Sequence, residues 1–264
     1  MLWFDTHFHI GPEKLAEADA ILSAAQAAGV TGLIVQGTSL EDCESTLGLT
    51  DGRDGVYATC GLHPHVADTP YEMDYFRTLF QNPKAVAVGE IGLDYYYDFS
   101  ARDNQRRMFA EFLRLAVELD KPVVIHSREA FEDTWAIVND CLPSGHPFEI
   151  HSFTGTLDEG EKWLERGAMM SINGMITFKK SDNVRAFNRI IPNDRLLLET
   201  DSPYLAPVPF RGKENTPAYI PVIAQYVANE RGVTLEELSE ITNTNAMRFF
   251  KIKEMPNQTG DNSQ

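Results

Sequence analysis

The chain has 264 residues, of which 43% are hydrophobic, and its formal net charge is −16. This length suits one large α/β domain with a sizeable core, and the apolar content excludes a chain that is disordered throughout. The acidic charge disfavours nonspecific binding to DNA or anionic membranes, so a nucleic-acid substrate would need a metal or a local basic patch.

Eight short apolar segments alternate with longer amphipathic ones along the chain. We predict strands at 2–6, 32–37, 56–61, 85–90, 122–126, 147–151, 168–172 and 196–201, each followed by a helix. Residues 108–119 show the helical pattern with particular clarity.

Three helix starts have recognisable signals. Thr156 with Glu159 and Thr234 with Glu237 have the spacing of capping boxes. Thr216 followed by Pro217 predicts an N-cap with proline at the first helical position.

The number of strand–helix units decides between two architectures. Eight such units in about 250 residues is the size of a TIM barrel. The alternative, a doubly wound open sheet, has no support from a GxGxxG or GxxxxGK[ST] motif. We therefore predict a single, slightly distorted (β/α)8 barrel over 1–253, followed by a flexible tail at 254–264.

The cysteines and the apolar segments bear on the compartment. Cys43, Cys60 and Cys141 form no CxxC motif, and their odd number argues against a disulfide framework. No apolar run approaches the roughly 18–20 residues of a membrane span, and the first residues lack a secretory pattern. We expect a cytoplasmic protein with no membrane association.

Metal-ligand residue types lie at the ends of five predicted strands. The active sites of barrel enzymes occupy the carboxyl ends of the strands, so these side chains would meet in one cavity. Histidine is the commonest metal ligand, and carboxylates complete such sites. The six residues are His7, His9, Glu90, His126, His151 and Asp201.

The number of these ligands predicts two metal ions. Six residues are more than one tetrahedral ion requires, whereas two ions about 3.5–4 Å apart with a bridging carboxylate would use all of them. Any one of these residues alone is more often a hydrogen-bonded structural group, but six in one register argue against that interpretation.

These residues lie in segments that resemble the TatD family of amidohydrolase-like barrels. The resemblance covers nearly the whole chain, up to about residue 250. Phe8, Ile10 and Thr216 depart from residues common in the family. The matching segments are Phe4-Asp5-Thr6-His7-Phe8-His9, Gly61-Leu62-His63-Pro64, Gly89-Glu90-Ile91-Gly92-Leu93-Asp94-Tyr95, Val124-Ile125-His126-Ser127-Arg128, Ile150-His151-Ser152-Phe153-Thr154-Gly155, Leu197-Leu198-Glu199-Thr200-Asp201-Ser202-Pro203-Tyr204 and Arg211-Gly212-Lys213-Glu214-Asn215.

The resemblance implies a distribution of the ligands. His7, His9 and Asp201 would hold one divalent cation, His126 and His151 the second, and Glu90 would bridge them. Zn, Mn, Mg and Ni all suit these ligand types. Asp201 and Glu90 would be the catalytic residues, and hydroxide formed from a metal-bound water would attack the substrate.

Four further residues are candidate substrate contacts. His63 ends the third predicted strand, and Arg128 follows His126 by two residues, where a guanidinium suits phosphate recognition. Arg211 lies in a loop after the eighth strand, and Tyr95 lies in a run of tyrosines that could stack a base or a sugar.

The favoured function is a metal-dependent phosphodiesterase or deoxyribonuclease that removes nucleotides from single-stranded DNA or RNA ends, with no obligate protein partner. The alternative is an amide or ester hydrolase, such as an aminoacyl-tRNA deacylase, because a fold does not determine its substrate. A closed pocket near Arg211 and Tyr95 would favour the deacylase, and an open groove would favour the nuclease. A binding protein without catalysis would be attractive only if a ligand were missing.

Overall fold

The computed structural model describes residues 1–255, so most of the predicted tail at 254–264 lies outside the described residues. Within the described part, no helix is both long and apolar enough to cross a membrane. The strands are β1 (Trp3–Phe8), β2 (Val30–Val35), β3 (Val56–Cys60), β4 (Ala85–Asp94), β5 (Val123–Arg128), β6 (Phe148–Ile150), β7 (Met169–Ile172) and β8 (Leu196–Leu198).

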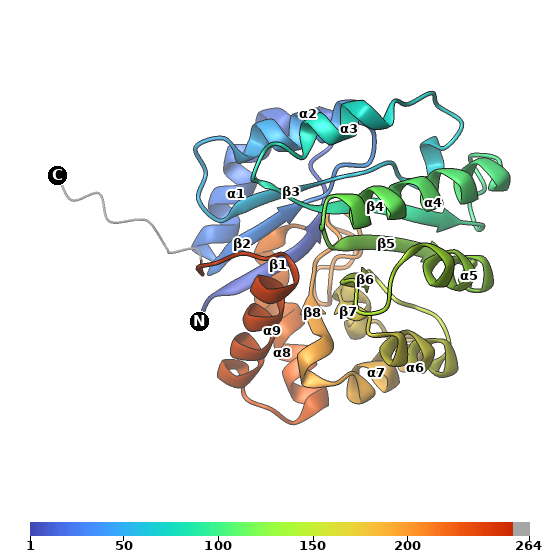
Figure 1. Cartoon of the computed structure of the whole chain (residues 1–264). Coiled ribbons are helices and arrows are strands. Elements are labelled where there is room, and N and C mark those ends of the chain that lie inside the picture. Colours follow the sequence, from blue (N-terminus) through green and yellow to red (C-terminus); the bar gives the residue numbers. More distant parts are fainter. Residues whose placement is uncertain (256–264) are drawn as a thin grey trace.

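The eight strands form one sheet in sequential order, β1 to β8, and all seven neighbouring pairs are parallel. The sheet curls into a nearly closed barrel with the helices around its outside (Figure 1). Hydrogen bonds join the two edge segments: the Asp201 N–H donates to the His7 carbonyl at 2.9 Å, and the His9 N–H donates to the Ser202 carbonyl at 2.7 Å. The predicted TIM-barrel fold is therefore confirmed.

Helices follow each strand, several of them through a short 3₁₀ turn. The α-helices are α1 (Ala18–Ala27), α2 (Leu40–Thr50), α3 (Met73–Leu79), α4 (Arg102–Glu118), α5 (Phe131–Cys141), α6 (Leu157–Arg166), α7 (Asp182–Ile190), α8 (Ile220–Arg231) and α9 (Leu235–Phe249). The turns are η1 (Pro12–Glu17), η2 (Pro64–Val66), η3 (Gly174–Thr177), η4 (Asn193–Arg195) and η5 (Pro217–Tyr219).

Several predicted boundaries were wrong. The fourth and fifth strands continue past the predicted ends, to Asp94 and Arg128, so Glu90 and His126 lie inside strands and not at their ends. The eighth strand stops at Leu198, and Asp201 follows it in a loop with φ of 54°. Sequence patterns place such boundaries poorly because pairing with neighbouring strands decides how far a strand continues.

The predicted helix starts are confirmed. Thr156 and Thr234 both form complete capping boxes with Glu159 and Glu237. Thr216 precedes Pro217 at the start of the turn η5, but its side chain makes no capping hydrogen bond. The predicted N-cap at Thr216 with proline at the first helical position is therefore confirmed.

The core has two parts. The larger cluster lies between the barrel and its helices and includes Phe109, Phe112 and Trp163. A second cluster fills the amino-terminal end of the barrel, where Phe4, Ile34 and Leu197 pack with Phe249 and Phe250 from the end of α9. The helix α9 therefore closes the end of the barrel opposite the predicted site.

The capping box of α9 gives a stability prediction. The Glu237 N–H donates to Thr234 Oγ1 at 3.1 Å, and the Thr234 N–H donates to Glu237 Oε2 at 2.8 Å. Thr234→Ala removes one of these bonds and should lower the free energy of unfolding by about 1 kcal/mol. Chemical denaturation measures the change.

Thr216→Ala is the matched control for this prediction, because the Thr216 side chain caps no backbone N–H. It should leave the free energy of unfolding within about 0.5 kcal/mol of the wild type. Equal losses in the two variants would contradict a capping contribution at Thr234.

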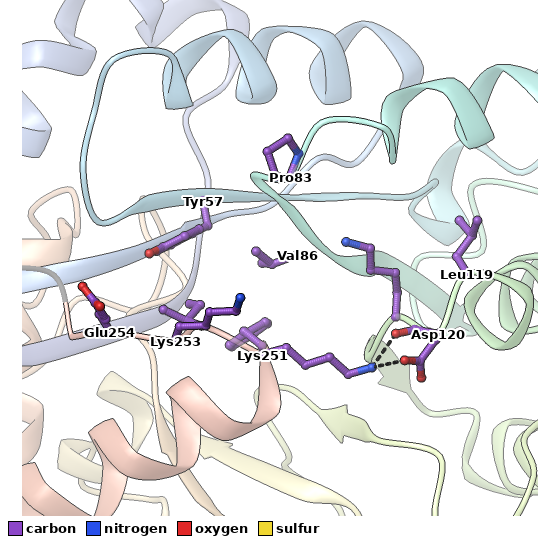
Figure 2. Close-up of a pocket in the computed structure, with 11 residues that line it drawn as sticks. Tyr57, Pro83, Val86, Leu119, Asp120, Lys251, Lys253 and Glu254 are labelled. Atoms are coloured by element: carbon purple, nitrogen blue, oxygen red, sulfur yellow. Dashed lines mark hydrogen bonds and ion pairs between the residues drawn. The ribbon is translucent and has the colours of Figure 1, made fainter.

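A cavity of about 620 Å³ has none of the predicted ligands in its lining. Figure 2 shows the side chains that line it. Tyr57 and Val86, the second residues of β3 and β4, line it, together with Lys251 and Lys253 after α9. It therefore opens at the amino-terminal end of the barrel, whereas the predicted metal ligands gather at the other end.

Candidate metal centre

The six predicted metal ligands converge at the carboxyl end of the barrel. His7 and His9 come from β1 and the residue after it, Glu90 from β4 and His126 from β5. His151 and Asp201 follow β6 and β8. Groups that combine His7, His9 and Asp201, or His7, Glu90 and His151, each bring their ligand atoms within 4.8 Å of one another.

Glu90 lies at the centre of this cluster. Its Oε1 is 2.9 Å from His151 Nε2 and 3.0 Å from His126 Nδ1. Its Oε2 is 3.4 Å from His7 Nε2 and 3.7 Å from His9 Nε2. The two carboxylate oxygens thus face two different pairs of histidines, as a bridging carboxylate would.

The close approach of β4 and β5 depends on a glycine. Gly92 has φ of 145°, and a Cβ atom there would lie 1.9 Å from the carbonyl oxygen of His126. Any other residue would push the two strands apart. This contact keeps Glu90 and His126 close to each other.

The distances between ligand atoms fit metal ions. His7 Nε2 and His9 Nε2 are 3.2 Å apart, and His126 Nδ1 and His151 Nε2 are 3.3 Å apart. Ligand atoms around a tetrahedral ion with bonds of about 2.1 Å are separated by about 3.4 Å. Asp201 Oδ1 lies 3.4 Å from His9 Nε2 and 3.8 Å from His7 Nε2, which completes a group of three.

Burial and neighbouring charges shift the pKa values within the cluster. Burial opposes ionisation of Glu90, but the charges of His151, His63 and His7 outweigh it and hold the pKa of Glu90 well below its usual range. Burial, followed by the charge of His151, lowers the pKa of His7. Despite burial, the acidic neighbours Glu90 and Glu199 raise the pKa of His151 well above its usual range. A divalent cation binds the ionised carboxylate and the neutral imidazole, so its binding would release protons from the histidines.

Asp94 and Glu199 each contact a candidate histidine ligand on the ring nitrogen that faces away from Glu90. His126 Nε2 lies 3.1 Å from Asp94 Oδ2, on the ring edge opposite Glu90. Glu199 lies 3.6 Å from His151 Nδ1 and accepts a hydrogen bond from Ser171 Oγ at 2.6 Å. Such carboxylates orient a histidine ring and increase its basicity.

The sequence interpretation missed Asp94 and His65. His65 Nε2 lies 3.0 Å from Asp94 Oδ2, so the carboxylate contacts two imidazoles at once. The available signal was the His63-Pro64-His65 segment together with an acidic residue four positions after Glu90. This segment alone does not show that Asp94 contacts His126. That contact depends on the pairing of β4 with β5, which places Asp94 beside Arg128 and Gly92 beside His126.

The role of Asp94 is testable with Asp94→Asn. This change removes the charge that orients His126, so metal affinity should fall about 10- to 100-fold. Titration with a competing chelator measures the affinity. Asp133→Asn is the matched control, because Asp133 bonds Tyr95 and Arg106 and no metal ligand. Equal affinities in Asp94→Asn and the control would contradict an orienting role.

The candidate substrate contacts lie in different surroundings. His63 Nε2 is 3.6 Å from Glu90 Oε1, so His63 belongs to the cluster and forms a further possible ligand group with Glu90 and His126. Arg128 is exposed and stacks on Tyr96, with its guanidinium carbon 4.1 Å from the ring centre.

Arg211 and Tyr95 have contacts of their own. The Arg211 guanidinium lies 3.9 Å from the centre of the Phe178 ring and donates to the Ala206 carbonyl at 3.2 Å. The Tyr95 hydroxyl donates to Asp133 at 2.5 Å. These contacts leave Tyr95 less available than the exposed Tyr96 and Tyr97 that follow it.

Comparison with known proteins agrees with the geometry. The family model described as TatD related DNase matches residues 4–251. An Escherichia coli (strain K12) protein named uncharacterized metal-dependent hydrolase YcfH is 38% identical over 256 residues, which cover 96% of this chain and 97% of the relative. A Musicola paradisiaca protein named 3′-5′ ssDNA/RNA exonuclease TatD is 36% identical over 245 residues, which cover 90% and 93%.

A solved structure has the same fold. The crystal structure of YJJV, a TatD homolog from Escherichia coli K12, superposes with a TM-score of 0.88 at 29% identity. The match covers 95% of this chain and 98% of that one.

Proposed function

The chain belongs to the TatD-related DNase family of metal-dependent hydrolases, and from this premise we propose that it removes nucleotides from the ends of single-stranded DNA or RNA. The scissile bond is a phosphodiester, and two divalent cations take part. A relative at 36% identity is named as a 3′-5′ ssDNA/RNA exonuclease, which supports this substrate class.

The observation that carries the proposal is the position of Glu90 between two groups of ligands. We assign His7, His9 and Asp201 to one cation and His126 and His151 to the other, with Glu90 shared. Each of the two carboxylate oxygens of Glu90 faces a different pair of histidines, which supports this assignment. When bound, such cations lower the pKa of a bound water and polarise a phosphoryl oxygen.

The residues of the chain have distinct roles in this proposal. Asp201 accepts the proton of the attacking water, because its carboxylate lies at the edge of the cluster and is ionised, with a pKa below its usual range. Burial alone would raise that pKa, but the hydrogen bond from His9 and the charges of the histidines outweigh burial. His63 lies beside Glu90 and contacts the leaving group, and Arg128 and Arg211 bind phosphate.

The test is cleavage of single-stranded DNA and RNA labelled at either end. The protein is stripped of metal and then refilled with Mg, Mn, Zn or Ni. We expect stepwise shortening from one end that requires the metal. A folded, metal-loaded protein that leaves both substrates intact overturns the proposal, and deacylation of aminoacyl-tRNA would then identify the alternative hydrolase.

A further inference from the structure

Three exposed aromatic side chains lie in the loop between β4 and α4. Tyr96, Tyr97 and Phe99 are 54%, 47% and 66% exposed. The rings of Tyr97 and Phe99 stack with centres 5.3 Å apart, and Tyr96 meets Tyr97 edge-on at 4.9 Å. We call these three residues the aromatic shelf. Contiguous exposed apolar groups of this kind mark binding surfaces more often than isolated ones do.

The aromatic shelf is attached directly to the metal centre. The backbone N–H groups of Tyr96 and Tyr97 donate to Asp94 Oδ1 at 3.0 and 2.9 Å. The other oxygen of Asp94 contacts the ligand His126. The ring of His65 lies 5.5 Å from Tyr97, 4.8 Å from Phe99 and 6.5 Å from His126. One carboxylate therefore positions both the shelf and a metal ligand.

Another aromatic ring stands beside the other group of ligands. Tyr204 is 64% exposed, and its ring centre is 6.4 Å from that of His9. The Tyr204 N–H donates to the carbonyl of Asp201 at 3.0 Å, so this residue is anchored beside a proposed ligand. Tyr204 belongs to the loop after β8, whereas the aromatic shelf belongs to the loop after β4.

A positive charge accompanies the aromatic shelf. The guanidinium carbon of Arg128 lies 4.1 Å from the centre of Tyr96 and 4.8 Å from that of Tyr97. Among residues 1–255, the Arg128 guanidinium has no hydrogen-bonding or ion-pairing partner. In a protein with a net charge of −16, an unpaired arginine on exposed aromatic rings has the chemistry to attract an anion that carries a flat apolar group.

We propose that the aromatic shelf stacks the bases of a single-stranded nucleic-acid end while Arg128 binds their phosphates, so that the terminal phosphodiester reaches the metal centre. Every base has a π-face, so such stacking tolerates any sequence. A duplex keeps its base faces covered, so this surface selects unpaired ends. This inference rests on the proposed function and specifies its substrate.

The test compares the metal-loaded wild type with a Tyr97→Leu/Phe99→Leu double variant on an end-labelled single-stranded oligonucleotide. Stacking on aromatic side chains contributes substantially per base, so KM should rise about tenfold or more. We expect kcat to change less than about threefold and the metal content to stay constant, because neither ring ligates metal. Tyr226→Leu is the control, since Tyr226 is exposed on α8.

A second substrate separates stacking from other effects of the double variant. An oligonucleotide with abasic sites in place of its last three bases should have a raised KM with the wild type. The double variant should raise that KM no further, because the stacked bases are already missing. An unchanged KM for the intact oligonucleotide, or equal increases with both substrates, overturns the role of the aromatic shelf.

Fluorescence anisotropy of the same oligonucleotides distinguishes failure of this inference from failure of the proposed function. If the wild type binds the intact strand without cleaving it, the nuclease proposal fails, and weaker binding by the double variant still supports stacking. If the wild type cleaves the strand and the double variant binds it equally well, the nuclease stands and the shelf is overturned. A wild type that neither binds nor cleaves overturns both.

Discussion

Asp201→Asn should lower kcat on single-stranded DNA by about 10²–10⁴-fold, the range that removal of a general base produces. An amide keeps the size of the side chain but cannot accept the proton of the attacking water. Asp201 Oδ1 lies 3.4 Å from His9 Nε2, so the substitution also removes an anionic ligand from one proposed cation. End-labelled oligonucleotides refilled in turn with Mg, Mn and Zn measure the loss.

The fold should survive this change, because Asp201 lies in a loop at the mouth of the barrel, and its side chain is 14% exposed. Asp194→Asn is the matched control, since Asp194 is exposed in the turn η4, which precedes β8 and so lies at the end of the barrel opposite the proposed ligands. We expect wild-type activity from the control. A metal-loaded Asp201→Asn protein with more than a tenth of wild-type activity would contradict the assigned role.

Glu90→Gln should have the largest effect on the centre as a whole. The carboxylate of Glu90 lies within 3.7 Å of five imidazoles, those of His7, His9, His63, His126 and His151. The amide cannot bridge two cations as a carboxylate does, so we expect no more than one tightly bound ion per chain. Activity should fall at least about 100-fold, because Glu90 would contact both cations and its loss would disturb both ligand groups.

The metal-free protein should also lose stability in Glu90→Gln. Removing one partner from a buried charged network leaves the other partners uncompensated and costs about 3–5 kcal/mol. Chemical denaturation after chelation measures this loss, and elemental analysis measures the bound metal. Glu161→Gln, a change at an exposed position on α6, is the control. Two tightly bound ions in Glu90→Gln would contradict the bridging position.

The sequence predicted the fold because the relevant signals are local. Alternating apolar and amphipathic segments predicted eight strand–helix units, and the capping boxes at Thr156 and Thr234 marked two helix starts correctly. Both signals depend on residues within a few positions of one another. They do not depend on how the sheet closes.

The strand boundaries required the tertiary structure. Glu90 and His126 were expected at strand ends, but β4 and β5 pair with each other as far as Asp94 and Arg128. The pairing is irregular between Val88 and Ile91, around Glu90 itself. Such irregularities redirect side chains near active sites, and a side-chain alternation rule cannot locate them.

The six candidate ligands could be selected from the sequence, because few residue types bind metals and each one ends or follows an apolar segment. The contacts between particular histidine nitrogens and carboxylate oxygens depend on the tertiary structure of the barrel. Only its closure brings His7 and Asp201, which are far apart in the chain, within 3.8 Å of each other. Strand pairing also places Asp94 against His126. The geometry of the following loop exposes Tyr97 and Phe99 in place of Tyr95. Both results depend on contacts between segments, which no local sequence pattern encodes.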